Sequence, residues 1–257
     1  MKSYKYEKFK YNIFVLISYI VGRKTNYNLV RVITYHNIND SDNDIFSVST
    51  SEFAKQIKLL KELNYKTVSI EEIFNNKYKE LNEKIIYITF DDGFKDIYKY
   101  AIPILEKYNY KATFFITTDF ITNEKNSNYL SWKEVQNLNK LGYNIGIHSH
   151  RHMMLSKLCK EEIKADIQTS QKLFYENLEF KSNLYSIPYG KKNSFNDNVI
   201  NLLKEAGFDY IFTQINGPIT KNTSKYLIPR NNISGFDSLT IFKRKLEGYF
   251  DFYRNYI

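Results

Sequence analysis

Residues 85–93 read Ile85-Ile86-Tyr87-Ile88-Thr89-Phe90-Asp91-Asp92-Gly93, a β-branched and aromatic run that ends on two carboxylates and a glycine. The run predicts a buried β-strand. Neighbouring strand residues point to opposite faces, so Asp91 and Asp92 reach one site only where the chain is already turning out of the strand, and Gly93 permits that turn. An Asp-Gly hairpin is the alternative, and it requires a second strand directly afterwards.

A helix is predicted after this turn instead, because Ile97, Ala101, Leu105 and Tyr108 recur at helical spacing. Strand, acidic turn and helix together place both acids at the carboxyl end of a strand, where ligands of α/β proteins collect. The same alternation continues along the chain. We expect further strands at residues 29–35, 65–70, 112–117, 143–147, 184–187 and 209–213, and helices at 53–63, 163–174 and 199–206.

Short connections between alternating strands and helices favour a parallel α/β sheet, either closed into a barrel or left open. Two helix starts have the spacing of a capping box, Ser69 with Glu72 and Ser131 with Glu134. A chain of 257 residues with no linker-like segment fits one large α/β domain or two small ones.

Composition excludes several classes of protein. Hydrophobic residues make up 43% and aromatic residues 17% of the chain, so a disordered chain is excluded. The net charge of +9 comes from dispersed lysines with no nucleic-acid motif, and we expect no nucleic-acid partner. The single cysteine, Cys159, excludes an internal disulfide, and we interpret it as a packing residue.

Residues 1–28 form a basic and apolar segment before a domain expected at residues 29–257. Four lysines precede the apolar run 11–22, which is too short to span a bilayer as a normal helix. No small-residue cleavage site follows it, so a cytoplasmic or membrane-associated location is favoured over secretion through a cleavable signal peptide. An interfacial helix, an uncleaved anchor and a helix packed on the domain remain open, and we favour the interfacial helix.

Three of the four histidines fall within residues 147–152, Ile147-His148-Ser149-His150-Arg151-His152. On a helical turn, His148 and His152 would face one side and His150 the other. Two imidazoles and one carboxylate leave open positions on a divalent metal for water and a substrate oxygen. Together with the Asp-Asp-Gly strand end, the pair predicts a metal site.

These motifs resemble those of the polysaccharide deacetylases, the NodB homology domain of carbohydrate esterases. The resemblance rests on Thr89-Phe90-Asp91-Asp92-Gly93 and His148-Ser149-x-x-His152, is supported by Pro188-Tyr189-Gly190, and covers the chain from about Val30 to its end. It implies a single-domain deformed (β/α) barrel. It also implies hydrolysis of the acetamide of an N-acetylhexosamine in a polysaccharide or a glycolipid precursor.

Residue roles also follow from the resemblance. Asp92, His148 and His152 are expected to hold a divalent metal, zinc first, with cobalt, nickel or iron as alternatives. Asp91 is expected to be the general base that takes a proton from the attacking water. The backbone N–H of Tyr189 is expected to stabilise the oxyanion.

The sequence departs from the family pattern at two points. The arginine that usually stands two positions before the proline of the third motif is Ser186 here, so we expect Arg230 to orient Asp91 instead. No histidine follows His152, which leaves His36 as the acid for the departing amine. A Tyr-His pair at an early strand end resembles the branch of deacetylases that act on poly-N-acetylglucosamine.

The sequence therefore predicts a metal-dependent N-deacetylase with an N-acetylated glycan as its partner and peripheral membrane association through the N-terminus. Two alternatives remain open. One is a catalytically impaired NodB-like domain that binds glycan, and the other is a related metal amidase acting on a non-sugar amide.

Overall fold

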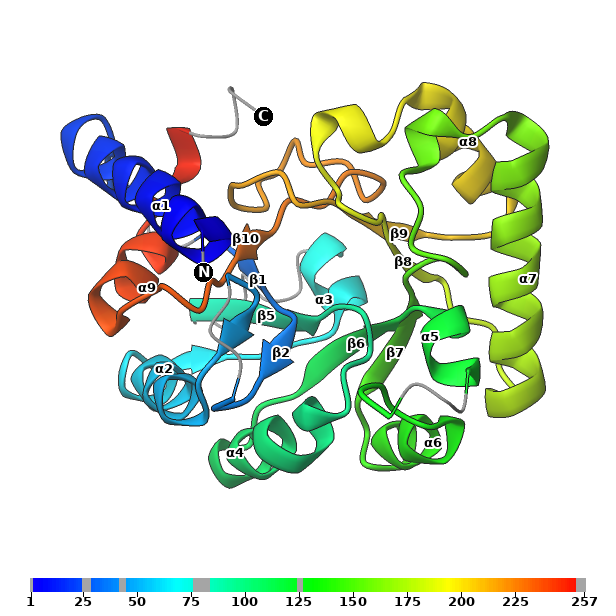
Figure 1. The fold of residues 1–257 in the computed structure, drawn as a ribbon, viewed down its shortest axis with the longest axis horizontal. Coiled ribbons are helices and arrows are strands. Elements are labelled where there is room, and N and C mark those ends of the chain that lie inside the picture. Colours follow the sequence, from blue (N-terminus) through cyan, green and yellow to red (C-terminus); the bar gives the residue numbers. More distant parts are fainter. Residues whose placement is uncertain (1, 25–28, 42–44, 76–83, 124–126, 253–257) are drawn as a thin grey trace.

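Strand β5 (Lys84–Phe90) is an inner strand of a curled parallel sheet in the computed structural model (Figure 1). The structure describes residues 2–24, 29–41, 45–75, 84–123 and 127–252. Consecutive β5 side chains divide between two cores. Ile86, Ile88 and Phe90 pack under the outer helices, whereas Ile85 and Tyr87 point into the barrel interior. This strand is buried on both faces, as its continuous apolar sequence predicts.

The sheet has eight strands in the described residues, all parallel, in the order β10-β1-β5-β6-β7-β8-β9, with β4 also paired to β5. The strands besides β5 are β1 (Arg31–Tyr35), β4 (Tyr65–Lys66), β6 (Ala112–Ile116), β7 (Asn144–Ile147), β8 (Leu184–Ser186), β9 (Tyr210–Phe212) and β10 (Asn231–Asn232). A separate pair, β2 (Asn37–Ile38) and β3 (Ser47–Val48), lies beyond the end of β1.

Helices surround the outside of this sheet (Figure 1). They are α2 (Thr50–Glu62), α4 (Ile102–Tyr108), α5 (Thr118–Thr122), α6 (Trp132–Lys140), α7 (Lys160–Leu178), α8 (Asp197–Glu205) and α9 (Leu239–Leu246), with α1 (Lys2–Ile20) beside α9. Helix α3 (Ile70–Phe74) instead packs with the interior cluster of Ile85 and Tyr87. Both predicted capping boxes are present, at Ser69 and at Ser131.

The sheet closes only partly into a barrel. Strands β9 and β10 form no ladder with each other, but Ile228 donates its N–H to the carbonyl of Ile211 at 2.9 Å, and Thr213 donates to the carbonyl of Ile228 at 2.9 Å. The chain leading into β10 therefore continues the sheet past β9. This arrangement confirms the prediction of one α/β domain built as a deformed (β/α) barrel.

Several local predictions need correction. The strand expected at 65–70 spans only Tyr65–Lys66, because Ile70 already begins α3. The helix expected from Ile97 opens with a π-helical turn, Ile97–Ala101, just before Pro103, which has no N–H to donate. Cys159 is exposed at the start of α7 and is not a packing residue.

Helix α1 packs one of its faces on the domain. Tyr11 joins Ile241 of α9 and Phe250 in a small apolar cluster, with Phe14 and Val15 beside it. The Tyr11 hydroxyl donates to Asp237, whose other oxygen accepts from Lys245 Nζ at 2.6 Å. The boundary expected after residue 28 lies outside the described residues, and no described helix is long and apolar enough to cross a membrane.

We predict that Tyr11→Phe weakens the attachment of α1. Burial and the neighbouring Asp237 carboxylate raise the pKa of Tyr11, so its hydroxyl remains a donor to a buried charge. Losing a hydrogen bond of this kind should lower the free energy of unfolding by about 1.5–3 kcal/mol. Urea denaturation measures the change, with Tyr6→Phe, an exposed tyrosine of the same helix, as the control. Equal stability of both variants would contradict a clamp at Tyr11.

Candidate active site

The two adjacent carboxylates meet because the chain turns sharply at the end of β5. Asp91 continues the strand alternation into the barrel interior and donates its backbone N–H to the carbonyl of Tyr35 at 3.0 Å. Asp92 would point outward, but its φ of 72° and the φ of 82° at Gly93 turn the chain back. The hairpin alternative is excluded, because the next strand, β6, lies parallel to β5.

His148 and His152 follow β7, and a loop rather than a helical turn brings them together. Ser149 and His152 adopt left-handed conformations with φ of 64° and 54°. Ser149 Oγ accepts the backbone N–H of His152 at 2.8 Å, which holds the loop in shape. His150 points elsewhere, since its Nδ1 lies 3.0 Å from Thr118 Oγ1. The expected helical turn is not present, but the two imidazoles face the same side, as predicted.

Asp92, His148 and His152 form a cluster in which one ligand atom from each lies within 4.8 Å of the others. The Nε2 atoms of His148 and His152 lie 3.4 and 3.3 Å from Asp92 Oδ1. Within the described part of the chain, no hydrogen bond satisfies this buried Oδ1. An orphaned carboxylate oxygen facing two imidazole nitrogens fits a divalent cation of the zinc type.

Two of the three groups hold the protonation states that a metal requires, whereas the carboxylates of Asp91 and Asp92 outweigh burial and raise the pKa of the third, His148, which would lose its proton on binding the metal. Burial, followed by the neighbouring His148, lowers the pKa of His152 to about 4, so its imidazole is neutral at pH 7. Burial opposes ionisation of Asp92, but the surrounding histidines outweigh it and hold the pKa of its carboxyl below the usual value. Neutral imidazole and ionised carboxylate are the forms that bind a metal. His148 Nδ1 lies 2.8 Å from the carbonyl of Ser186, which orients the ring with Nε2 toward Asp92.

A buried ion pair holds Asp91. The Arg230 guanidinium donates from Nη1 and Nη2 to the two carboxylate oxygens, each at 2.7 Å, and both side chains are almost fully buried. Ser186 Oγ accepts from Arg230 at 2.7 Å and donates to Asp91 at 3.2 Å. Burial alone would raise the pKa of Asp91, but Arg230 and His148 outweigh it and keep the pKa well below the usual range.

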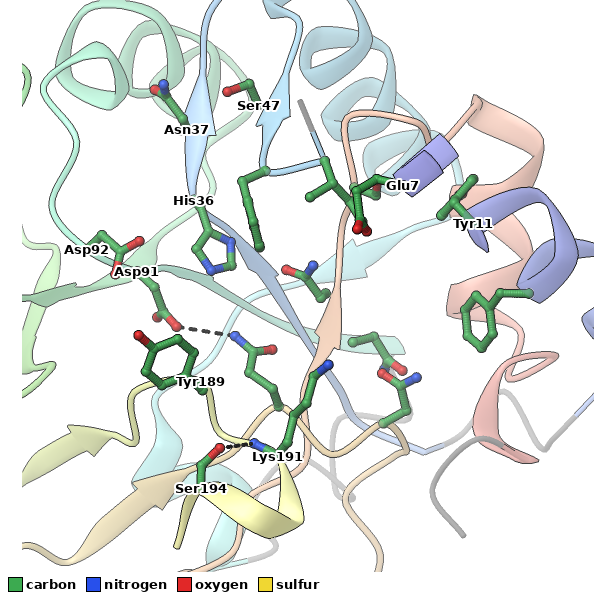
Figure 2. Close-up of a pocket in the computed structure, with 18 of the residues that line it drawn as sticks. Glu7, Tyr11, His36, Asn37, Ser47, Asp91, Asp92, Tyr189, Lys191 and Ser194 are labelled. Carbon is green, nitrogen blue, oxygen red and sulfur yellow. Dashed lines mark hydrogen bonds between the residues drawn. The ribbon is translucent and has the colours of Figure 1, made fainter. Parts of the chain in front are cut away.

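His36 and Tyr189 reach the same place from opposite sides (Figure 2). His36 follows β1, its ring centroid lies 5.1 Å from that of Phe46 with the planes tilted by 58°, and burial lowers the pKa of its imidazole. Tyr189 has a φ of 62°, and its ring lies 4.9 Å from that of His152. Gly190 must be glycine, since a Cβ there would lie 2.5 Å from the backbone N of Gln214.

Six of the seven predicted site residues line one cavity, whose volume is about 930 Å³. The seventh, Arg230, lies behind the cavity wall and hydrogen-bonds to Asp91. Sequence reasoning missed Gln214, whose Nε2 donates to Asp91 Oδ2 at 3.3 Å. Its position just after β9 could have indicated it, because polar residues at the carboxyl ends of parallel strands lie at the same edge of the sheet as Asp91. It also missed that α1 lines this cavity.

Comparison with known protein families gives a match to the polysaccharide deacetylase model over residues 78–211. The chain is 32% identical over 239 residues to a poly-β-1,6-N-acetyl-D-glucosamine N-deacetylase from Staphylococcus aureus, covering 88% of this chain and 81% of that protein. It is 26% identical to a putative polysaccharide deacetylase, YxkH, from Bacillus subtilis, covering 79% and 71%.

Solved structures share the fold. The Streptococcus pyogenes deacetylase PplD in complex with acetate aligns with a TM-score of 0.75 at 21% identity, covering 86% of this chain and all of that one. IcaB from Ammonifex degensii aligns with a TM-score of 0.72 at 21% identity, covering 86% and 97%. These alignments confirm the deformed barrel predicted from the sequence.

We predict that Arg230→Met strongly destabilises the metal-free protein, because it leaves a buried carboxylate unpaired. The expected loss at pH 7 is about 3–5 kcal/mol in the free energy of unfolding. A carboxyl with a lowered folded-state pKa contributes stability above its unfolded pKa and loses it on acidification. The difference between wild type and variant should therefore narrow as the pH falls and Asp91 in the variant takes up a proton.

Urea denaturation of chelated protein across the acid range measures this difference. Ser186→Ala is the matched control, since it removes a neutral partner that hydrogen-bonds both charges but leaves the charges paired, and it should cost about 1.5–3 kcal/mol. If Arg230→Met were no more destabilising than Ser186→Ala, the ion pair would not be the group that holds Asp91.

Proposed function

The chain belongs to the polysaccharide deacetylase family, and from that premise we propose that it is a metal-dependent N-deacetylase of poly-N-acetylglucosamine. The observation that carries the proposal is the meeting of Asp91, His36 and the Asp92–His148–His152 cluster in one cavity. The name of the Staphylococcus aureus relative supports the choice of polymer.

Asp92, His148 and His152 would hold the divalent metal. One carboxylate and two imidazoles suit zinc first, and cobalt, nickel or iron share the same donors. Such an ion, when bound, makes water more acidic and polarises the acetamide carbonyl.

Asp91 is proposed as the general base. Arg230 fixes both of its oxygens, and Gln214 and Ser186 contact Oδ2 as well, so the carboxylate is held ionised and in one orientation. A carboxylate fixed in this way can accept the proton of the attacking water without first reorienting. The backbone N–H of Tyr189 is the proposed oxyanion donor, because no described residue accepts a hydrogen bond from it.

His36 is proposed as the general acid. No described group hydrogen-bonds its buried Nδ1, and the ring lines the cavity that contains Asp91 and Asp92. Burial lowers the pKa of this imidazole, whereas the carboxylates of Asp92 and Asp91 oppose that shift and favour the protonated ring, which would pass its proton to the departing amine.

At both departures from the family pattern, a residue from elsewhere in the chain lies where the missing side chain would be needed. Arg230 occupies the position on Asp91 left open by Ser186, and His36 is in the cavity although no histidine follows His152. This supports turnover over a domain that only binds glycan. A cavity of about 930 Å³, lined from the metal cluster to helix α1, has room for more than one acetamide and supports a glycan over a small non-sugar amide.

The test is acetate release from β-1,6-linked N-acetylglucosamine pentamer by purified protein. Release should stop on chelation and return on reloading with zinc. Asp91→Asn and His36→Ala should each lower kcat by about 10²–10⁴-fold, because each removes a proton-transfer group. His150→Ala, which alters a histidine outside the cluster, should leave kcat at the wild-type value.

Stoichiometric zinc binding without acetate release from any of several N-acetylated glycans would overturn the deacetylase. The glycan-binding domain or the non-sugar amidase would then replace it.

The outer face of α1 supports a second proposal, peripheral binding to an anionic membrane surface. Apolar side chains three or four residues apart are exposed there, while Lys5 and Lys8 are exposed on the same helix. The exposed fractions are 57% for Tyr6, 62% for Phe9, 44% for Ile13, 59% for Leu16, 40% for Ile17 and 74% for Ile20. An apolar stripe flanked by lysines matches the interface of an anionic bilayer.

We expect the protein to sediment with vesicles that contain phosphatidylserine and less with vesicles of phosphatidylcholine alone. Phe9→Ser and Leu16→Ser should each weaken binding by about tenfold or more, because each removes a large apolar side chain from the interface. Leu227→Ser, at an exposed leucine away from α1, is the control. Unchanged sedimentation of both α1 variants would rule out this face as the contact.

A further inference from the structure

The loop of residues 148–152, which carries two of the three candidate metal ligands, has an unfavourable backbone conformation. Ser149 and His152 both adopt left-handed conformations, with φ of 64° and 54°. Residues with a Cβ are disfavoured in this region and persist there only where surrounding contacts fix the backbone. Other parts of the chain must therefore hold the 148–152 loop in shape.

The two histidines of this loop differ in how their rings are fixed. His148 is 2% exposed, and its Nδ1 lies 2.8 Å from the carbonyl of Ser186, which orients the imidazole. His152 is 21% exposed, its Nε2 lies 3.3 Å from Asp92 Oδ1, and no described residue forms a hydrogen bond with its Nδ1. The position of the His152 ring therefore depends on the backbone of the loop.

Neighbouring segments accept or donate most of the hydrogen bonds of that backbone. Residues 117–119 bond three consecutive loop carbonyls at 3.0 to 3.3 Å, through a threonine hydroxyl and two backbone N–H groups. Ser149 Oγ accepts the N–H of His152 at 2.8 Å. The consecutive N–H groups of His150 and Arg151 still require an acceptor.

A buried carboxylate from α7 accepts both of these N–H groups. Asp166 Oδ1 accepts from His150 at 2.9 Å, and Asp166 Oδ2 accepts from Arg151 at 3.1 Å. Consecutive N–H groups that converge in a turn form a concave site that prefers an anion. Asp166 is only 2% exposed, and no cationic side chain of the described residues pairs with it. A charge buried for two backbone hydrogen bonds indicates that the loop conformation is what it stabilises.

Helix α7 is a firm support for this carboxylate. The helix contacts both α5 and β7, the elements on either side of the loop (Figure 1). Its buried face includes Ile163, Ile167 and Phe174, and Asp166 belongs to the same face. The carboxylate is thus fixed relative to the strand from which His148 emerges.

We propose that Asp166 is a positioning residue for the metal centre, because it holds the 148–152 loop in the conformation that brings His152 to Asp92 and His148. The proposal rests on the proposed metal-dependent function. It adds a residue that touches neither the metal nor the substrate. Both carboxylate oxygens are needed, since an asparagine would accept one N–H and turn its own NH₂ group toward the other.

The test measures the zinc affinity of the purified protein by competition with a chromophoric chelator. Asp166→Ala should lower this affinity by about 10–100-fold, the usual effect of removing a group that orients metal ligands. Asp166→Asn, the variant nearest in shape, should lower it less, because one acceptor oxygen remains. Phe174→Leu, at a buried side chain further along α7, is the control. It disturbs the packing of the helix and should keep the wild-type affinity.

Unchanged zinc affinity in both Asp166 variants would overturn the proposal. An equal loss in Phe174→Leu would overturn it too, because Asp166 would then act only through the stability of α7. If the wild type bound no zinc, the proposed metal-dependent function would fail separately. Hydrogen exchange of the His150 and Arg151 amides in chelated protein would then decide whether Asp166 holds the loop. Faster exchange of these amides in Asp166→Asn supports that role, and wild-type rates refute it.

Discussion

The buried ion pair between Asp91 and Arg230 is the interaction on which the rest of the structure depends. Asp91 directly follows the inner strand β5, and Arg230 directly precedes the edge strand β10, which is separated from β5 by β1. Two charges removed from water are tolerated only when each is paired in good geometry, and here two hydrogen bonds of 2.7 Å supply it. The pair thus ties the edge strand of the half-closed barrel to an inner strand and orients the carboxylate at the rim.

Much of the fold and site was predictable because the decisive residues lie in short motifs. The apolar run before Asp91 specifies a strand buried on both faces, and strand ends in a parallel sheet share one edge. Asp92 and the two histidines therefore had to converge, whatever the conformation of the loop. What the sequence could not specify was that conformation, since the left-handed residues Ser149 and His152 are set by hydrogen bonds rather than by helical spacing.

Long-range contacts account for the other omissions. Strand β10 has only two residues, Asn231 and Asn232, and no pattern of two residues distinguishes a strand from a loop. The contribution of α1 to the cavity depends on Tyr11 reaching Asp237, 226 positions away, which no local pattern encodes. Gln214 likewise reaches Asp91 across the barrel.

Ser186 and Arg230 illustrate how a missing motif residue can be replaced in space. The small serine accepts a hydrogen bond from Arg230 Nη2 at 2.7 Å and donates to Asp91 at 3.2 Å, which leaves room for a guanidinium supplied by the residue just before β10. An arginine at position 186 would compete for the same volume and add a second cation to a fully buried site. Positions 186 and 230 are therefore coupled, because only one of them can supply the guanidinium that pairs with Asp91. The same reasoning applies to His36, which reaches the cavity from the first strand of the domain.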